Sequence, residues 1–285
     1  MPIIIENLSY TYSPNTAFAH DALKNVHMTI DDGEFIGIIG HTGSGKSTLV
    51  LHLNGLIKLT SGKIIVNDID LSKKYDYKKL RSTVGIVFQY PEHQLFDATV
   101  EKDIAFGPKN LGLSKEEIQD RVRSAISMVG LDYESIKDRS PFELSGGQKR
   151  RVALAGVIAM HPKILILDEP TAGLDPKGKE SILELVHIFK KATQATVIMI
   201  SHNMDEVYEH CTRIAVLNQG ELAYYLRPDE LVQHSQELDS MGLGVSTSAR
   251  IARQLRERGV NLKPDIYKQE QLISDVLKLY KGERA

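Results

Sequence analysis

The chain has 285 residues, of which 42% are apolar and 25% charged, and its formal net charge is −2. This composition is typical of a soluble globular protein of one or two domains, and it gives no overall attraction to nucleic acid or an anionic membrane. The single cysteine, Cys211, excludes an internal disulfide, favours a reducing compartment and is expected to be buried. Neither a signal peptide nor a membrane-spanning run is expected from the apolar pattern.

Buried strands are predicted by four short runs that are apolar at nearly every position. They cover residues 35–39, 84–88, 164–167 and 196–200. Because helical stretches lie between them, we expect an α/β fold with a mostly parallel sheet joined by crossover helices. Residues 3–30 are more polar and alternate, which predicts antiparallel strands beside that sheet.

A glycine-rich segment after the first buried run matches the phosphate-loop pattern, in which four residues separate a glycine from Gly-Lys-Ser. It comprises Gly40, His41, Thr42, Gly43, Ser44, Gly45, Lys46, Ser47 and Thr48. The segment lies between a predicted strand and a predicted helix, and its glycines would let backbone N–H groups face phosphate oxygens. We expect Lys46 to reach the β- and γ-phosphates of a nucleotide and Ser47 to ligate Mg²⁺.

Polar residues also follow the other three buried runs: Gln89, then Asp168 with Glu169, then His202. Carboxyl ends of parallel strands share one edge of a sheet, so these side chains should converge on the phosphate loop. We expect Gln89 and Asp168 near Mg²⁺ and the water. Glu169 would orient or deprotonate the attacking water, with His202 near the γ-phosphate. Taken singly they have structural alternatives, since a lone histidine is usually structural and an acid before Pro170 can cap a helix.

A capped helix is predicted over residues 114–130, between the second and third buried runs. Ser114 fits the N-cap, Glu117 stands at the capping-box position three residues later, and Gly130 fits the stop. This region separates the phosphate loop from the next glycine-rich motif.

A Leu-Ser-Gly-Gly-Gln turn opens the following helix and comes after a helical region rather than a strand. It comprises Leu144, Ser145, Gly146, Gly147 and Gln148. Lys149, Arg150 and Arg151 stand in the first helical turn, where cations oppose the helix dipole. A nearby anion would relieve this conflict, although the arginines could instead point to solvent. Because the turn lies outside the expected crevice, the nearest phosphate would belong to a partner subunit.

The pattern changes after residue 222 to charged amphipathic segments. A helix is expected to start at Arg227-Pro-Asp-Glu, and two more helices are expected over 246–258 and 269–280. We therefore divide the chain into a main domain, residues 1–222, and a small C-terminal domain, residues 223–285.

With these motifs in this order and spacing, the chain resembles the ATP-binding cassette (ABC) ATPases over about residues 3–225. The resemblance implies a P-loop NTPase core with an antiparallel β subdomain and a helical signature subdomain at about 90–160. Residues 40–48 resemble the Walker A loop of that family, and residues 164–169 resemble its Walker B strand. Residues 144–148 resemble the signature, and residues 172–175, which include Asp175, resemble the D-loop. Gln89 corresponds to the Q-loop glutamine and His202 to the switch histidine.

The resemblance also implies ATP and Mg²⁺ as ligands, hydrolysis by Glu169, His202 and Lys46, and a signature that closes on ATP held by the opposite subunit. A tyrosine is expected to stack on adenine. By spacing this is Tyr12, although Tyr10 is also available and either could be an ordinary strand residue.

Residues 88–96 and 99–108 are similar to a segment of the energy-coupling factor (ECF) importers, in the version found in the second of their two ATPases. This similarity implies an ATP-driven motor subunit on the cytoplasmic face of the cell membrane. Its partners would be a second, non-identical ATPase, a transmembrane coupling subunit and a substrate-binding membrane subunit for vitamins or metal ions. In that group a groove near this segment receives short helices of the membrane subunit, and the C-terminal domain helps to hold the ATPases together.

Two other functions stay open from the sequence: an ATPase of another ABC importer type, and a soluble ABC protein of DNA repair or translation. The soluble proteins usually carry a long coiled-coil insertion or two cassettes. Here Gln148 and Asp168 are too close for an insertion, and there is one phosphate loop. The transported solute and the choice between homodimer and heterodimer are not encoded in these motifs.

Overall fold

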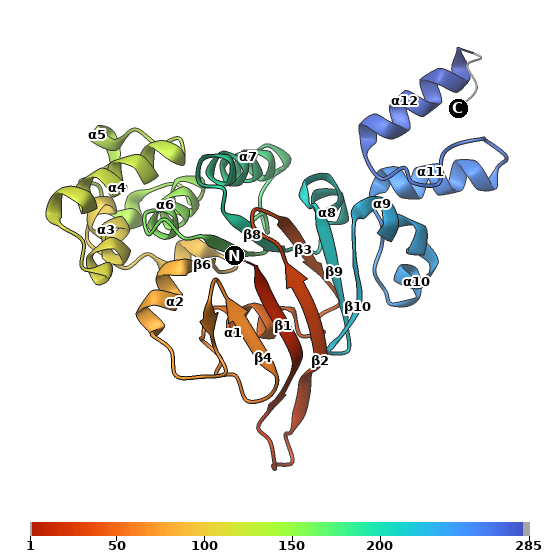
Figure 1. Cartoon of the computed structure of the whole chain (residues 1–285). Coiled ribbons are helices and arrows are strands. Elements are labelled where there is room, and N and C mark those ends of the chain that lie inside the picture. Colours follow the sequence, from red (N-terminus) through yellow and green to blue (C-terminus); the bar gives the residue numbers. More distant parts are fainter. Residues whose placement is uncertain (1, 282–285) are drawn as a thin grey trace.

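The computed structural model describes residues 2–281 and places them in two sheets flanked by helices (Figure 1). Met1 of the expected main domain and residues 282–285 of the expected C-terminal domain lie outside the described residues. No helix within residues 2–281 combines the length and apolarity needed to cross a membrane.

The larger sheet has six strands in the order β10-β9-β3-β8-β7-β6. Their bounds are β3 (Phe35–Ile39), β6 (Val84–Val87), β7 (Ile164–Asp168), β8 (Thr196–Ile200), β9 (Arg213–Asn218) and β10 (Glu221–Leu226). All neighbouring pairs are parallel except β9 and β10. The four apolar runs are therefore the parallel strands β3, β6, β7 and β8, as predicted, because both faces of this sheet are covered.

The smaller sheet is antiparallel and runs in the order β2-β1-β4-β5. It comprises β1 (Ile3–Tyr12), β2 (His20–Ile30), β4 (Lys63–Val66) and β5 (Ile69–Asp70). Its apolar face shares one core with the larger sheet and with α1 (Lys46–Leu53), the helix that follows the phosphate loop. The antiparallel strands expected over residues 3–30 are confirmed, and they bring Tyr12 close to the phosphate loop.

Helices cover the other face of the larger sheet and one of its edges (Figure 1). They are α2 (Tyr77–Thr83), η1 (Pro91–Gln94), α3 (Val100–Leu111), α4 (Lys115–Met128), α5 (Tyr133–Ile136), η2 (Pro141–Glu143), α6 (Gly146–Ile158), α7 (Pro176–Thr193) and α8 (Met204–His210). The predicted capping box holds at α4, where Ser114 and Glu117 exchange side-chain and backbone hydrogen bonds. Cys211, which follows α8, is buried as expected.

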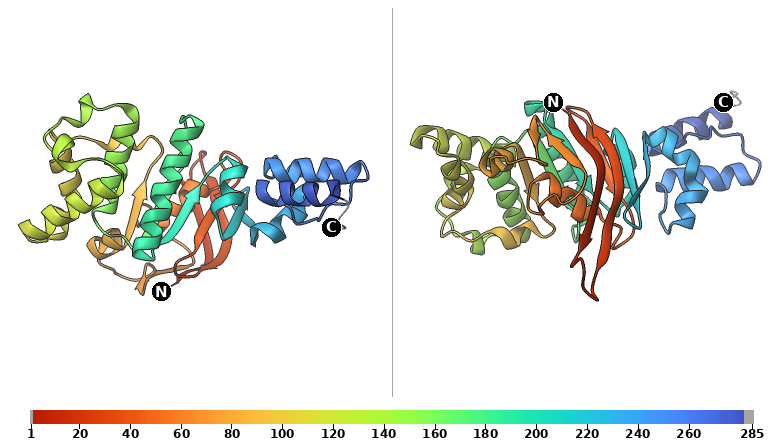
Figure 2. Two further views of the ribbon diagram at one scale, coloured as in Figure 1. Left: turned by 90° about the horizontal axis from the view of Figure 1, so that it is seen from above. Right: turned by 60° about the horizontal axis from the view of Figure 1, so that its bottom comes forward.

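The C-terminal helices form a separate group at the far end of the molecule, beside β9 and β10 (Figure 2). They are α9 (Pro228–Leu231), η3 (Val232–His234), α10 (Ser235–Ser240), α11 (Thr247–Glu257) and α12 (Gln269–Tyr280). The helices expected from Arg227, over 246–258 and over 269–280 are all present. The boundary expected at residue 222 is too early, because β10 crosses it and pairs with β9 as far as Leu226.

The C-terminal helices contact the rest of the chain at β9 and β10, against which α9 packs, and at α8. Thr247 donates its hydroxyl to Asp205 at 2.8 Å, and the Lys268 ammonium lies 3.0 Å from a carboxylate oxygen of Glu209. Since α8 begins two residues after His202, this group of helices is attached close to one of the expected catalytic residues.

Candidate active site

At two positions of the phosphate loop, neither the backbone conformation nor the available space suits a residue other than glycine. Gly40 and Gly45 have φ angles of +155° and +102°, in a region that residues with a side chain rarely adopt. A Cβ atom at Gly40 would collide with the Leu217 carbonyl, and one at Gly45 with the Ala22 carbonyl. The loop therefore packs directly against neighbouring backbone before it enters α1.

Lys46 lies inside the curl of this loop, with only 7% of its surface exposed. Its ammonium donates hydrogen bonds to the carbonyl oxygens of Gly40 at 2.7 Å and His41 at 2.8 Å. Burial lowers the pKa of Lys46, while the carboxylates of Glu169 and Asp168 oppose that shift. The loop thus concentrates a positive charge where the sequence predicts the β- and γ-phosphates.

Asp168 ends β7 and faces the phosphate loop. Its Oδ2 atom accepts a hydrogen bond from the Ser47 hydroxyl at 3.4 Å, across 121 positions of sequence. Burial and the adjacent Glu169 carboxylate raise the pKa of Asp168, against Ser47, Lys46 and His202. Hydroxyl and carboxylate oxygens are ligands that suit Mg²⁺, so the donor set of Ser47 and Asp168 fits that ion.

Glu169 has a strained backbone, with φ of +49°, which is uncommon for a residue with a side chain. Its N–H donates to the Ile200 carbonyl at 2.9 Å, which fixes the end of β7 to the end of β8. Strain of this kind persists only where the surroundings enforce it.

The Glu169 carboxylate lies between two of the residues predicted to join it. Gln89 Nε2 donates to Glu169 Oε2 at 2.8 Å, and His202 Nε2 lies 2.8 Å from Glu169 Oε1. The residues that follow β6, β7 and β8 therefore converge, as the parallel topology predicts. The hydrogen bond of Gln89 goes to the expected base Glu169. Its expected part in binding Mg²⁺ stays a prediction.

Beside the phosphate loop, where adenine stacking is expected, lies a cavity of about 270 Å³ lined by Tyr12, His20, Ala22 and residues 43–48. The Tyr12 hydroxyl lies 3.2 Å from Thr48 Oγ1. Tyr10 instead packs edge-on against Tyr12 and His52, which favours Tyr12 as the stacking residue. His20 was not predicted from the sequence. It reaches the cavity because it pairs with Tyr12 across β1 and β2, a register that the local pattern does not reveal.

The Leu-Ser-Gly-Gly-Gln turn begins α6 with a capping box. Ser145 Oγ accepts from the Gln148 N–H at 3.3 Å, and Gln148 Oε1 accepts from the Ser145 N–H at 3.1 Å. Leu144 is buried, whereas Gly146 and Gly147 are exposed with open space around a hypothetical Cβ. The turn presents a helix N-terminus to the surface, where it can meet an anion from outside the chain.

The two arginines after this turn do not point to solvent. Arg150 is 5% exposed, contacts both carboxylate oxygens of Glu92 at 3.3 Å and donates to the Ala172 carbonyl at 2.9 Å. Arg151 donates to Ser181 Oγ at 2.8 Å. The Arg150 charge is therefore paired with Glu92 inside the chain, and the alternative in which the arginines point to solvent is wrong. An anion near the turn stays a prediction.

Asp175, the expected D-loop residue, caps α7 and accepts a hydrogen bond from the Gly178 N–H at 2.9 Å. Ala172, which precedes it, receives the bond from Arg150 on α6. The segment after β7 is thereby joined to the signature helix. Both segments are recognisable from their sequence motifs, but the motifs do not indicate the contact between Arg150 and Ala172.

The chain is similar to known proteins over the segment that contains most of these residues. A family model described as "ABC transporter" matches residues 23–172, just over half of the chain. The chain belongs to this family. As an ABC ATPase it binds and hydrolyses ATP.

Curated relatives of this ABC ATPase are similar over its whole length. It is 50% identical over 285 residues, all of both chains, to the energy-coupling factor transporter ATP-binding protein EcfA2 of Clostridium acetobutylicum. It is 52% identical over 268 residues, 94% of each chain, to the protein of the same name from Clostridium perfringens. The similarity therefore includes the C-terminal helices beyond the matched family model.

Solved structures agree with the cassette fold of this ABC ATPase. CbiO1 of Clostridium perfringens, part of the ABC transporter complex CbiONQ, has a TM-score of 0.74 and 38% identity over 90% of this chain and 98% of that one. A dimeric ATP-binding cassette in a post-hydrolysis state with ADP and Pi has a TM-score of 0.69 and 30% identity over 79% of this chain and 98% of that one.

Proposed function

We propose that this ABC ATPase is the ATP-hydrolysing motor subunit of an energy-coupling factor importer that takes up vitamins or metal ions. The observation that carries the proposal is the full-length similarity, at about 50% identity, to proteins named EcfA2. The chemistry rests on its own residues, since a phosphate loop, two carboxylates, Gln89 and His202 meet at one edge of the sheet.

Hydrolysis would be carried by Glu169 and His202. The Glu169 carboxylate is placed to orient the attacking water or to accept its proton, and His202 stands beside it to contact the γ-phosphate. Lys46 would supply fixed positive charge to the phosphoryl oxygens. Ser47 and Asp168, with Gln89 close by, would hold Mg²⁺, which neutralises charge on the β- and γ-phosphates when bound.

A second cassette would complete each ATP site. The exposed N-terminus of α6, with Gly146 and Gly147, suits contact with phosphate held by the partner. The exposed apolar side chains of α12 support association through the C-terminal helices. They lie on one helical face: Ile273, Val276, Leu277 and Tyr280. The partner inferred here is a non-identical ATPase of the same family.

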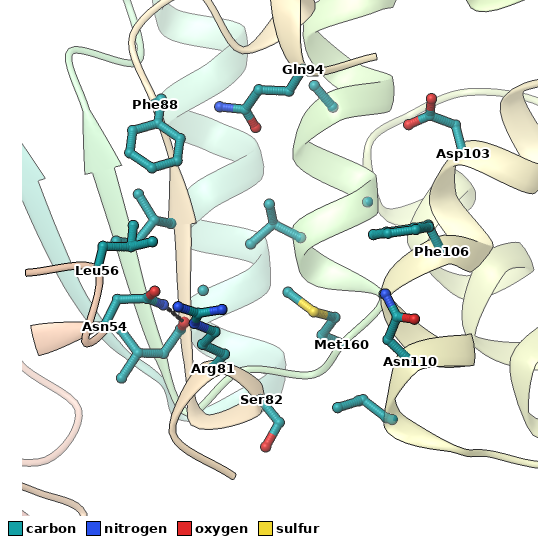
Figure 3. Close-up of a pocket in the computed structure, with 18 of the residues that line it drawn as sticks. Asn54, Leu56, Arg81, Ser82, Phe88, Gln94, Asp103, Phe106, Asn110 and Met160 are labelled. Carbon is teal, nitrogen blue, oxygen red and sulfur yellow. Dashed lines mark hydrogen bonds between the residues drawn. The ribbon is translucent and has the colours of Figure 1, made fainter. Parts of the chain in front are cut away.

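The docking site for the transmembrane coupling subunit would be a groove of about 620 Å³ between α2, β6, α3 and α6. Phe88 and Phe106 lie on opposite sides of this groove in Figure 3, and Phe106 and Phe96 are 50% and 58% exposed. Exposed aromatic side chains around a large apolar groove suit an inserted helix with an apolar face. The chain would thereby be held on the cytoplasmic face of the membrane as a peripheral subunit.

The test is purification of the intact chain from its native membrane in mild detergent, with mass spectrometry of the proteins that accompany it. We expect a second, non-identical ATPase together with a small transmembrane coupling protein and a membrane subunit that binds the solute. A homodimer with a two-domain permease would instead assign the chain to another importer type. Recovery as a free protein from the cytosol would contradict the proposal.

A further inference from the structure

A buried carboxylate, Glu206, lies in the first turn of α8, behind the loops that carry Glu169 and His202. Only 7% of its surface is exposed. Taking a carboxylate out of water is costly unless hydrogen bonds and an opposite charge compensate. Glu206 stands four residues after His202. It is not needed to cap α8, because Asn203 already forms the N-cap.

Groups from three segments satisfy the two oxygens of Glu206. Oε2 accepts from Thr171 Oγ1 at 2.7 Å and from Ser201 Oγ at 3.3 Å. Oε1 accepts from Asn203 Nδ2 at 2.8 Å and lies 3.5 Å from the Lys179 ammonium on α7. Both oxygens of the Glu206 carboxylate therefore have hydrogen-bond partners, and the bonds from the two hydroxyls are buried.

These partners flank the hydrolytic residues in sequence. Thr171 comes two residues after Glu169, and Ser201 and Asn203 stand on either side of His202. One carboxylate thus ties the segment after the base to the loop of the switch histidine. The 2.8 Å separation of Glu169 Oε1 and His202 Nε2 depends on the relative position of those two segments.

The backbone strain at Glu169 has to be supported by its neighbours. A residue with φ of +49° relaxes unless its neighbours hold it. The bond from its N–H to Ile200 fixes one side. The bond between Glu206 and Thr171 fixes the chain just after it.

We propose that Glu206 is a positioning residue for ATP hydrolysis, which acts through Thr171 and Ser201 to keep His202 within hydrogen-bonding distance of Glu169. The proposal rests on the assignment of Glu169 and His202 as the hydrolytic pair. Glu206 is expected to set turnover rather than nucleotide affinity, because its bonds go to the loops and not to the phosphate loop.

The first test is Glu206→Gln in the full chain, assembled with the partners it purifies with. The amide removes the negative charge that Lys179 pairs with, and its N–H end cannot accept from the Thr171 and Ser201 hydroxyls, so the network has to rearrange. We expect kcat to fall about 10- to 100-fold, since small misplacements of catalytic groups have effects of this size, while KM for ATP changes less than about threefold. Glu184→Gln is the matched control, because Glu184 is exposed on α7, and wild-type kinetics are expected there.

A second pair of variants separates positioning from general destabilisation. Thr171→Val removes the hydroxyl that binds Glu206 and keeps the side-chain shape, so it should lower kcat in the same way. Thr171→Ser keeps the hydroxyl and should recover most of the turnover. Because Glu206→Gln and Thr171→Val break the same hydrogen bond, the double variant should be little slower than either single one.

Turnover is normalised to the number of ATP-binding sites, so that loss of folded protein does not lower it. An unchanged kcat per site in Glu206→Gln would overturn the proposal, as would full additivity of the two substitutions. If Glu206→Gln does not fold, Thr171→Val against Thr171→Ser still decides the question. Failure of the proposed function is distinguishable, because wild-type protein would then lack ATP turnover or the membrane partners.

Discussion

At the scale of single residues, one carboxylate lies at the centre of the proposed hydrolytic site. Glu169 is reached from β6 by Gln89 and from β8 by His202, each at 2.8 Å. The order of these residues along the chain is apparent from the sequence, because each follows a run of branched apolar residues. The sequence does not show that both oxygens of Glu169 are paired. This pairing depends on how far each strand extends and on the left-handed backbone at position 169.

Glu169→Gln tests this assignment. The amide keeps the size of the side chain but cannot accept a proton from water, so kcat should fall by about 100-fold or more while ATP still binds. Steady-state hydrolysis and filter binding of ATP measure the two effects separately. Turnover at the wild-type rate in this variant would show that another group acts as the base.

Asp168 gives the site a dependence of stability on pH. Burial and Glu169 raise its folded pKa above the ordinary value of 3.8, so the ionised carboxylate costs folding free energy at neutral pH. This cost disappears as the pH falls through the folded pKa to below the unfolded value. Asp168→Asn should therefore raise Tm at neutral pH without nucleotide or Mg²⁺, by roughly 2 °C for each kcal/mol recovered, with a gain that shrinks in acid.

Thermal unfolding of both proteins across the acidic range measures this difference. The same substitution should lower ATP turnover, because it removes an expected Mg²⁺ ligand. A Tm difference that stays constant as the pH falls would mean that the Asp168 charge is not its cause.

At the scale of elements, α6 joins two functions that the sequence shows as separate motifs. Its N-terminus presents the signature turn, and its first turn carries Arg150 to Glu92 in η1 and to Ala172 after β7. The segment after Gln89 also borders the groove that includes Phe88 and Phe106. A ligand in that groove therefore lies next to an element bonded directly to α6, which gives a short structural route from the groove to the signature.

Phe106→Asp on α3 tests the groove. A charge at this half-exposed position should weaken docking of an apolar helix and reduce recovery of the coupling subunit several-fold, while ATP binding is unchanged. The detergent pull-down measures it. Phe142→Asp is a matched control, because Phe142 is also exposed but lies outside the groove. Equal loss of the coupling subunit in both variants would contradict the assignment of the groove.

At the scale of the whole molecule, the C-terminal helices pack on β9 and β10 through α9 and also bond to α8, the helix that follows His202. Thr247 binds Asp205 and Lys268 binds Glu209, so both contacts are on α8. α12 lies beside α11 (Figure 2), and its apolar side chains Ile273, Val276, Leu277 and Tyr280 are exposed. Association through that face would therefore act on an element connected to His202.

Ile273→Asp on α12 is expected to weaken association of the two ATPases by about tenfold or more, because it places a charge in an apolar contact. Analytical ultracentrifugation of the purified ATPase pair measures the change. Glu270→Ala, an exposed substitution on the same helix, should associate like the wild type. Unaltered association of Ile273→Asp would remove α12 from the interface.

The sequence by itself determined the parallel strands, the phosphate loop, the signature turn and the capped helices, because each depends on periodicity or turn chemistry within a few residues. It also indicated the edge of the sheet where the polar residues meet. Tertiary structure alone decided that β10 carries the sheet to Leu226, that Arg150 is buried against Glu92, and that Glu206 links the two catalytic loops. Those features join groups up to 58 positions apart, and local patterns carry no information about such contacts.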